Sequence, residues 1–82
     1  MGKIENVLSA ILHGASDNNI TFSDLRHALE SLGFEVRIKG DHFIYTKHEV
    51  AEIINIQPIG NKAKACLVKQ VRNLILKYKL AR

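Results

Sequence analysis

The sequence predicts an α+β domain in which two helices precede a three-stranded antiparallel sheet and one helix follows it. Three observations lead to this prediction. Apolar residues recur every three or four positions in residues 4–12, 22–32 and 67–78, the period of an amphipathic helix. They alternate with polar residues in 34–46, the period of a strand with one buried face. Gly40-Asp41 interrupts that alternation with a pair suited to a tight hairpin turn.

One polar connector divides the chain. It spans residues 13–19 and follows a first helix whose apolar face contains Ile4, Val7, Leu8, Ile11 and Leu12. We therefore interpret residues 1–20 as an N-terminal helix with its connector, which could be an appendage, and residues 21–82 as the main domain. A chain of 82 residues supports a single modest core, which excludes a second catalytic lobe.

The two helices of the main domain have recognisable ends and faces. Thr21 is a suitable N-cap with Asp24 in the first turn, and Gly33 suits the left-handed position that follows a helix. The apolar face of this second helix contains Phe22, Leu25, Leu29 and Leu32. The apolar face of the last helix contains Leu67, Val71, Leu74, Ile75 and Tyr78.

The length of the hairpin loop decides which side chains share a face of the sheet. A two-residue loop at Gly40-Asp41 makes Lys39 the cross-strand neighbour of His42. One face then enters the core with Phe34, Val36, Ile38, Phe43 and Tyr45. The opposite face carries Arg37, Lys39, His42, Ile44 and Thr46. A loop one residue longer would invert this assignment, because neighbouring side chains in a strand point to opposite faces.

A third strand is expected over residues 51–57, closed by Pro58. Its core members are Ile54 and Ile56, and its residues on the face of His42 are Ile53, Asn55 and Gln57. We expect helices on one side of the sheet only. Ile44 and Ile53 would then form an apolar pair on the other side, exposed for a protein partner unless the first helix folds across it.

His42 is the candidate catalytic residue. Histidine accepts or donates a proton near neutral pH without a perturbing environment. Cations at Arg37 and Lys39 could hold a phosphate beside the ring. In RNA the 2′-OH supplies the nucleophile, so one base and a few cations would be sufficient for slow cleavage to a 2′,3′-cyclic phosphate. Taken alone, a single strand histidine is more often a solvent-facing residue without a role.

Positive charge is concentrated at the C-terminal end. The net charge is +4, but residues 1–60 sum to −3 and residues 61–82 contain seven Lys or Arg and no acid. This asymmetry favours a polyanionic partner, although an ordinary solvated basic helix face fits the composition equally well. The segment Gly60-Asn61-Lys62-Ala63-Lys64, at the expected start of the last helix, could bind an anion through backbone N–H groups and lysines.

Other chemistry finds little support in the sequence. The single Cys66 excludes an internal disulfide, and no His or Cys spacing predicts a metal site, so we expect no cofactor. No apolar run approaches the roughly 20 residues of a membrane span, so we expect no membrane association. The opening residues lack the apolar core of a secretory signal, so the expected location is cytoplasmic.

Three motifs occur in the order typical of one family. They are Arg37-Ile38-Lys39-Gly40-Asp41-His42, the strand Ile54-Asn55-Ile56-Gln57-Pro58, and the basic helix that begins near Gly60-Asn61-Lys62-Ala63-Lys64. In this respect the chain, from about Thr21 to Leu80, resembles the HicA (YcfA-like) toxins, the mRNA interferases of HicA–HicB toxin–antitoxin pairs. The resemblance implies a fold like a double-stranded-RNA-binding domain, with His42 at the catalytic position. It departs from the family pattern at Asp41, where Ser or Thr is usual, and at Phe43, often a second histidine.

The resemblance thus implies a metal-independent endoribonuclease acting on mRNA. From the placement of positive charge we expect the phosphate-binding residues to be Arg37, Lys39, Lys62, Lys64 and Lys69. The resemblance implies a HicB-like antitoxin as the partner. Either Asp41 reduces activity, or its carboxylate points away from the phosphate. Two alternatives stay open. One is a non-catalytic RNA-binding module of the same fold, and the other is a protein-interaction domain whose basic helix complements an acidic partner.

Overall fold

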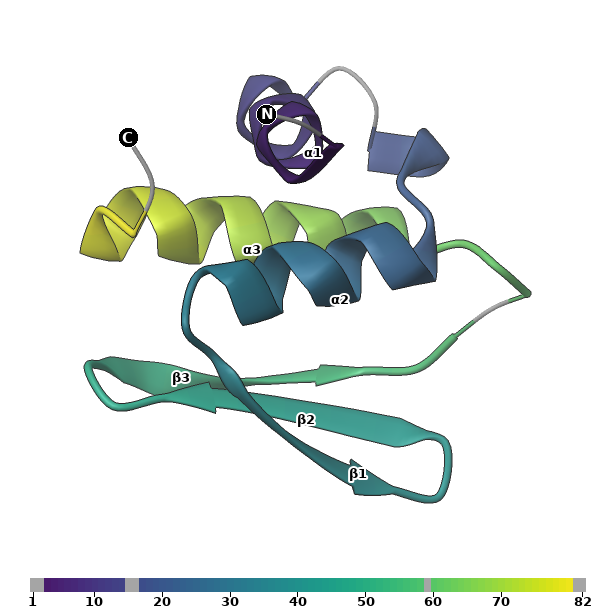
Figure 1. Ribbon diagram of the computed structural model, residues 1–82, viewed down its shortest axis with the longest axis vertical. Coiled ribbons are helices and arrows are strands. Elements are labelled where there is room, and N and C mark those ends of the chain that lie inside the picture. Colours follow the sequence, from purple (N-terminus) through teal and green to yellow (C-terminus); the bar gives the residue numbers. More distant parts are fainter. Residues whose placement is uncertain (1–2, 15–16, 59, 81–82) are drawn as a thin grey trace.

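Three layers make up the molecule, and the computed structural model describes them over residues 3–14, 17–58 and 60–80. A three-stranded sheet forms the first layer, α2 and α3 cover one of its faces, and α1 lies across these two helices on the side away from the sheet (Figure 1). The elements are α1 (Lys3–His13), the 3₁₀ turn η1 (Asp17–Asn19), α2 (Phe22–Ser31), β1 (Glu35–Lys39), β2 (His42–Lys47), β3 (Val50–Ile56) and α3 (Ala65–Tyr78). The predicted fold class and element order are confirmed.

The sheet has the expected antiparallel order β1-β2-β3, and its first hairpin has the two-residue loop. Lys39 pairs with His42 across this loop, and Gly40 has a φ of 62°, a left-handed value that a residue without a Cβ adopts at little cost. β3 runs one residue earlier than predicted, from Val50 to Ile56. Its pairing with β2 is irregular between Tyr45 and Lys47. Before this irregularity Tyr45 pairs with Ile54 and Ile44 pairs with Asn55, which confirms the predicted faces of β2 and β3.

Local capping explains where α2 begins and ends. The Thr21 hydroxyl accepts a hydrogen bond of 3.0 Å from the backbone N–H of Asp24, which satisfies one of the free donors of the first turn. After Leu32, Gly33 has a φ of 95° and turns the chain toward β1. Both predicted ends of this helix are confirmed.

The core fills the space on both sides of the α2–α3 layer, and it includes residues of all three layers. Its largest fully buried side chains are Ile11, Leu25, Leu29, Tyr45, Ile54, Ile56, Val68, Val71 and Ile75. The prediction that Val36 and Ile38 belong to this core is wrong, because their side chains are 36% and 56% exposed. They lie on the helix side of the sheet, but β1 is one of the two edge strands and the helices do not extend over it (Figure 1).

α1 is tied to the rest of the chain by burial and by one arginine. Its Ile11 is fully buried against α2 and α3. Arg72 of α3 donates hydrogen bonds to the carbonyl of Ile11 at 3.1 Å and to the carboxylate of Asp17 at 3.0 Å. This guanidinium therefore joins α3, α1 and η1. The predicted boundary at residue 20 stays a prediction that unfolding experiments can test.

Within the described ranges, no helix has the length and apolar character needed to cross a membrane.

Candidate functional site on the outer face of the sheet

The face of the sheet opposite α2 and α3 carries the candidate site, and we call it the outer face. In the part of the chain that the structure describes, all helices lie on the other side (Figure 1). The outer face comprises Glu35, Arg37, Lys39, His42, Ile44, Thr46, Ile53, Asn55 and Gln57. Because α1 lies beyond α2 and α3, it does not cover the apolar pair of Ile44 and Ile53, which settles one alternative left open by the sequence.

His42 is the first residue of β2 and stands directly after the hairpin turn. Its cross-strand partner is Lys39, as predicted. Opposite residues in an antiparallel pair have Cβ atoms about 5 Å apart, so the ammonium group of Lys39 can reach a group bound at the ring. The His42 side chain is 46% exposed. A solute molecule can therefore reach the imidazole from the outer face.

Two side-chain amides contact the imidazole. One belongs to Asn55 of β3, and the other belongs to Gln57, which directly follows β3. Nδ1 of His42 lies 3.4 Å from Oδ1 of Asn55, and Nε2 lies 3.4 Å from Nε2 of Gln57. The Asn55 oxygen can only accept, so Nδ1 carries the proton in the neutral ring and Nε2 is left to accept from the Gln57 amide. Both hydrogen bonds are long, so they orient the ring without holding it tightly.

Asp41 turns toward His42. One carboxylate oxygen lies 3.7 Å from Nε2 of His42, and the other accepts a hydrogen bond of 3.4 Å from the Gln57 amide. Of the two expectations for this residue, the one in which its carboxylate points away from the proposed phosphate site beside His42 is therefore wrong. A carboxylate at this distance attracts a protonated imidazole and repels a phosphate. Asp41 is 72% exposed, so water and salt weaken both effects.

The predicted phosphate-binding residues fall into separate groups. Arg37 and Lys39 are exposed on the outer face of β1. Lys62 and Lys64 lie in the extended segment that leads into α3, which begins only at Ala65. Figure 1 places this segment and the β1–β2 turn at the same end of the molecule, on the right.

The segment Gly60–Lys64 is thus not the first turn of a helix. It runs antiparallel to the start of α2, where the N–H of Ala63 donates to the carbonyl of Ile20 at 3.0 Å, and the N–H of Phe22 donates to the carbonyl of Asn61 at 2.9 Å. The N–H of Ala63 therefore has an intramolecular acceptor. Any anion held there would depend on the exposed lysines.

α3 contributes less free charge than its sequence indicates. Arg72 is engaged with Asp17, and Lys77 Nζ lies 2.7 Å from a carboxylate oxygen of Glu52. The hydrogen bond from Lys77, with one from a tyrosine hydroxyl, lowers the pKa of Glu52 from its ordinary value of 4.5 to about 2. Lys69 is exposed, but α3 lies on the helix side, so the sheet separates it from the outer face. The structure does not bring Lys69 and His42 together.

A shallow hollow of about 690 Å³ lies beside the His42 cluster. Ile44, Ile53, Thr46, Arg37 and Lys39 contribute to its lining. The side chain of Ile53 is 61% exposed, which is unusual for an isoleucine in a strand. The predicted apolar pair is therefore accessible from solvent.

Sequence reasoning did not find the polar cluster under the sheet. Tyr45 is fully buried, as predicted, but its hydroxyl accepts from Arg26 Nε at 3.0 Å and donates to Glu30 at 3.1 Å. Burial raises the pKa of Tyr45, and the hydrogen bond to Tyr45 raises the pKa of Arg26. The signal was available, because a buried tyrosine needs a hydrogen-bond partner and Arg26 and Glu30 are one turn apart on α2.

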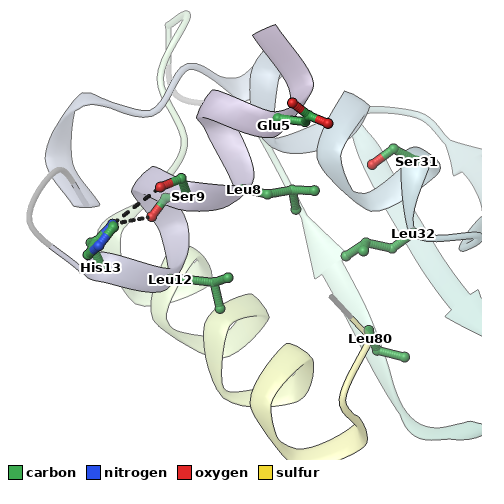
Figure 2. A pocket seen from close by; sticks show the side chains of 8 residues that line it. All are labelled: Glu5, Leu8, Ser9, Leu12, His13, Ser31, Leu32 and Leu80. Carbon is green, nitrogen blue, oxygen red and sulfur yellow. Dashed lines mark hydrogen bonds between the residues drawn. The ribbon is translucent and has the colours of Figure 1, made fainter. Parts of the chain in front are cut away.

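A second hollow of about 630 Å³ lies between α1, the end of α2 and the segment after α3 (Figure 2). Leu8, Leu12, Leu32 and Leu80 supply its apolar lining. The His13 ring donates from Nδ1 to the backbone carbonyl one turn earlier in α1, at 2.9 Å. Its ring is therefore used to close the end of its own helix.

No cluster of three or more metal-ligating side chains occurs within residues 3–14, 17–58 and 60–80. Together, the fold and the outer face define a small α+β domain with an exposed histidine in a polar cluster. Comparisons of the chain with protein-family models, with curated proteins and with solved structures gave no match.

Proposed function

We propose that this protein is a metal-independent endoribonuclease of the HicA type, which cleaves mRNA as the toxin of a toxin–antitoxin pair. The observation that carries the proposal is the exposed imidazole of His42 directly opposite Lys39, with Arg37 two residues along the same strand. A proton-exchanging group and two cations on one open face are the minimum that cleavage of a phosphodiester by its own 2′-OH requires.

In this mechanism Nε2 of His42 accepts the proton of the RNA 2′-OH. The 2′ oxygen then attacks the phosphorus, the bond to the 5′ oxygen breaks, and a 2′,3′-cyclic phosphate forms. Lys39 and Arg37 stabilise the negative charge that develops on the phosphorane oxygens. The leaving 5′ oxygen takes its proton from water or from the protonated ring. One acid/base group contributes about 10²–10⁴-fold, so turnover would be slow.

Gln57 gives this mechanism a route to a free Nε2. Its amide contacts both the imidazole and the Asp41 carboxylate at 3.4 Å. When the 2′-OH replaces the Gln57 amide at Nε2 of His42, that amide can still donate to the Asp41 carboxylate. Asn55 continues to accept from Nδ1, which keeps the lone pair on Nε2.

The proposed protein partner is a HicB-like antitoxin that covers the outer face. Exposed Ile53 and half-buried Ile44 would supply the apolar part of that contact beside His42. An inhibitor seated there would exclude RNA from the imidazole.

The test is cleavage of a single-stranded RNA in EDTA by the purified chain. We expect products ending in a 2′,3′-cyclic phosphate, and we expect His42→Ala to reduce the cleavage rate by about 100-fold or more. The matched control is His27→Ala, which removes an exposed histidine of α2. Unfolding temperatures should agree among the three proteins. If His42→Ala cleaves as well as the parent, His42 is not the catalytic residue.

The position of the Asp41 carboxylate favours a second candidate function, that of a non-catalytic RNA-binding module of the same fold. This carboxylate lies close to the ring where a scissile phosphate would bind. This alternative predicts salt-sensitive RNA binding with no cyclic-phosphate product. His42→Ala would then leave the affinity for RNA essentially unchanged.

A further inference from the structure

The free backbone edge of β1 takes no part in the proposed function, although the side chains of Arg37 and Lys39 in the same strand do. All five of its residues are exposed, and β1 pairs only with β2 among the described residues. The opposite edge of the sheet is different. There the N–H of Ala51 donates to the hydroxyl of Tyr78 at 3.4 Å, and Glu52 binds Lys77 and Tyr78. α3 therefore protects the β3 edge, whereas the β1 edge has no such cover.

The hairpin loop determines which backbone groups of β1 point outward. A two-residue loop makes Lys39 and His42 a hydrogen-bonded pair, and such pairs alternate along the ladder. Glu35, Arg37 and Lys39 therefore direct their N–H and C=O groups toward β2. Val36 and Ile38 direct theirs toward solvent. The same two residues have apolar side chains that are 36% and 56% exposed.

We propose that β1 pairs antiparallel with β1 of a second copy of this chain, which joins two sheets into one of six strands. In the register that uses the whole strand, Val36 lies opposite Ile38 of the second copy, and this pair occurs twice. Each of the two pairs exchanges two backbone hydrogen bonds, so four unpaired donors become paired. The apolar side chains cover one another on the helix side of the joined sheet.

Charge complementarity on the outer face favours a second copy as the occupant. In the same register Glu35 lies opposite Lys39 of the second copy, again twice. Only Arg37 meets its own equivalent, at the two-fold axis, where both side chains are exposed and can separate. A strand protected against pairing would carry one sign of charge and repel itself. The sequence Glu35-Val36-Arg37-Ile38-Lys39 is instead nearly self-complementary.

Registers shifted by two residues form fewer bonds. One of them would need the N–H of Phe34, which already donates to the carbonyl of Leu29 at 3.2 Å. The other would need Gly40, which lies in the turn. The full-length register is therefore the one in which every pair belongs to the strand. The interface is short, so we expect a weak dimer that assembles with rising concentration.

Sedimentation equilibrium of the purified chain tests the dimer from about 10 μM to 1 mM. The decisive variants are charge reversals. Glu35→Lys and Lys39→Glu each turn both attractive pairs into repulsive ones, so each should weaken dimerisation by about tenfold or more. The double variant restores opposite charges in both pairs, so it should recover the affinity of the parent.

The control is Glu49→Lys, which makes the same change of charge in the β2–β3 turn, away from β1. It should dimerise like the parent. Circular dichroism establishes that each variant keeps its fold, and amide exchange should show Val36 and Ile38 protected only at high concentration. A chain that stays monomeric throughout the range overturns the proposal, as does a double variant no better than its single variants. Neither result depends on whether the protein cleaves RNA.

Discussion

Asn55 and His42 lie on adjacent strands in diagonal positions, with Oδ1 of Asn55 3.4 Å from Nδ1 of His42. Ile44, and not His42, is the direct partner of Asn55 in the ladder. The amide therefore reaches the ring along the strand direction. This contact decides which ring nitrogen carries the proton, and hence which one is available to a substrate.

The first prediction concerns this tautomer. In the neutral ring of the parent protein, nitrogen chemical shifts should show the proton of His42 mainly on Nδ1. Asn55→Leu removes the acceptor, so the two tautomers should become more equally populated. Asn73→Leu, an exposed change in α3, is the control and should alter nothing at His42. Unchanged His42 shifts in Asn55→Leu would contradict the assigned hydrogen bond.

The second prediction concerns the carboxylate beside the ring. Asp41→Asn removes a negative charge 3.7 Å from His42 while keeping the size of the side chain. RNA affinity at low salt should rise about two- to fivefold, the effect of one exposed charge. The gain should vanish at high salt because screening removes exposed charge interactions. Glu49→Gln, in the other hairpin turn, should produce a smaller gain. Equal gains in the two variants would show that only net charge matters.

The third prediction tests whether α1 folds with the rest of the chain. Ile11→Ala deletes a fully buried side chain of α1 and should lower the free energy of unfolding by about 2–5 kcal/mol. A single shifted transition is expected, because this side chain packs on α2 and α3 in one common core. Ser9→Ala, an exposed change in the same helix, is the control. Urea unfolding followed by circular dichroism measures both. If α1 unfolded in a separate early transition, the boundary at residue 20 would divide two folding units.

The fourth prediction concerns the buried hydroxyl under the sheet. Tyr45→Phe removes the acceptor of Arg26 and the donor to Glu30, so it should destabilise the fold by about 1–2 kcal/mol. Since burial raises the pKa of Tyr45 above 10.0, the neutral hydroxyl persists in the fold where the unfolded chain ionises. The parent should therefore lose this contribution as the pH rises above about 10. Chemical denaturation across this range should show the variant approaching the parent.

The fifth prediction uses Glu52, whose pKa is lowered to about 2 mainly by Lys77. A carboxyl with a lowered pKa in the fold stabilises it above the unfolded value and loses this contribution as the pH falls. The loss should occur between about pH 4.5 and 2. Glu52→Gln should be less stable than the parent at neutral pH, and the difference should shrink through this range. Lys77→Met removes the largest cause of the lowered pKa of Glu52, so it should also be less stable than the parent at neutral pH, with a difference that shrinks as the pH falls. Parallel pH profiles for parent and variants would exclude the assigned ion pair.

Local sequence patterns were sufficient for most of the fold. Thr21 and Gly33 delimit α2 because capping depends on a few adjacent residues. The register at Lys39 and His42 followed from the two-residue loop. The error at Val36 and Ile38 has a different origin, because alternation shows which side of a strand is apolar but not whether a helix extends over that strand.

The candidate site was predicted only in part. Placing Arg37, Lys39 and His42 on one face needed only the pairing of two neighbouring strands. The orientation of the Asp41 carboxylate toward His42 could not be predicted, because it depends on a side-chain conformation. The ion pairs of α3 could not be predicted either, because their carboxylates come from segments distant in sequence. The charge count of α3 was misleading for the same reason, since Arg72 and Lys77 bind carboxylates from η1 and β3.

The order of the three layers indicates where a label can be attached without covering the sheet. α1 is separated from the sheet by the whole α2–α3 layer (Figure 1). A biotin or fluorophore attached to an exposed residue of α1, such as Ser9, would lie on the side remote from His42 and from the β1 edge. Immobilised that way on a sensor surface, the molecule would present both regions to RNA, to an inhibitor protein, or to further copies of itself.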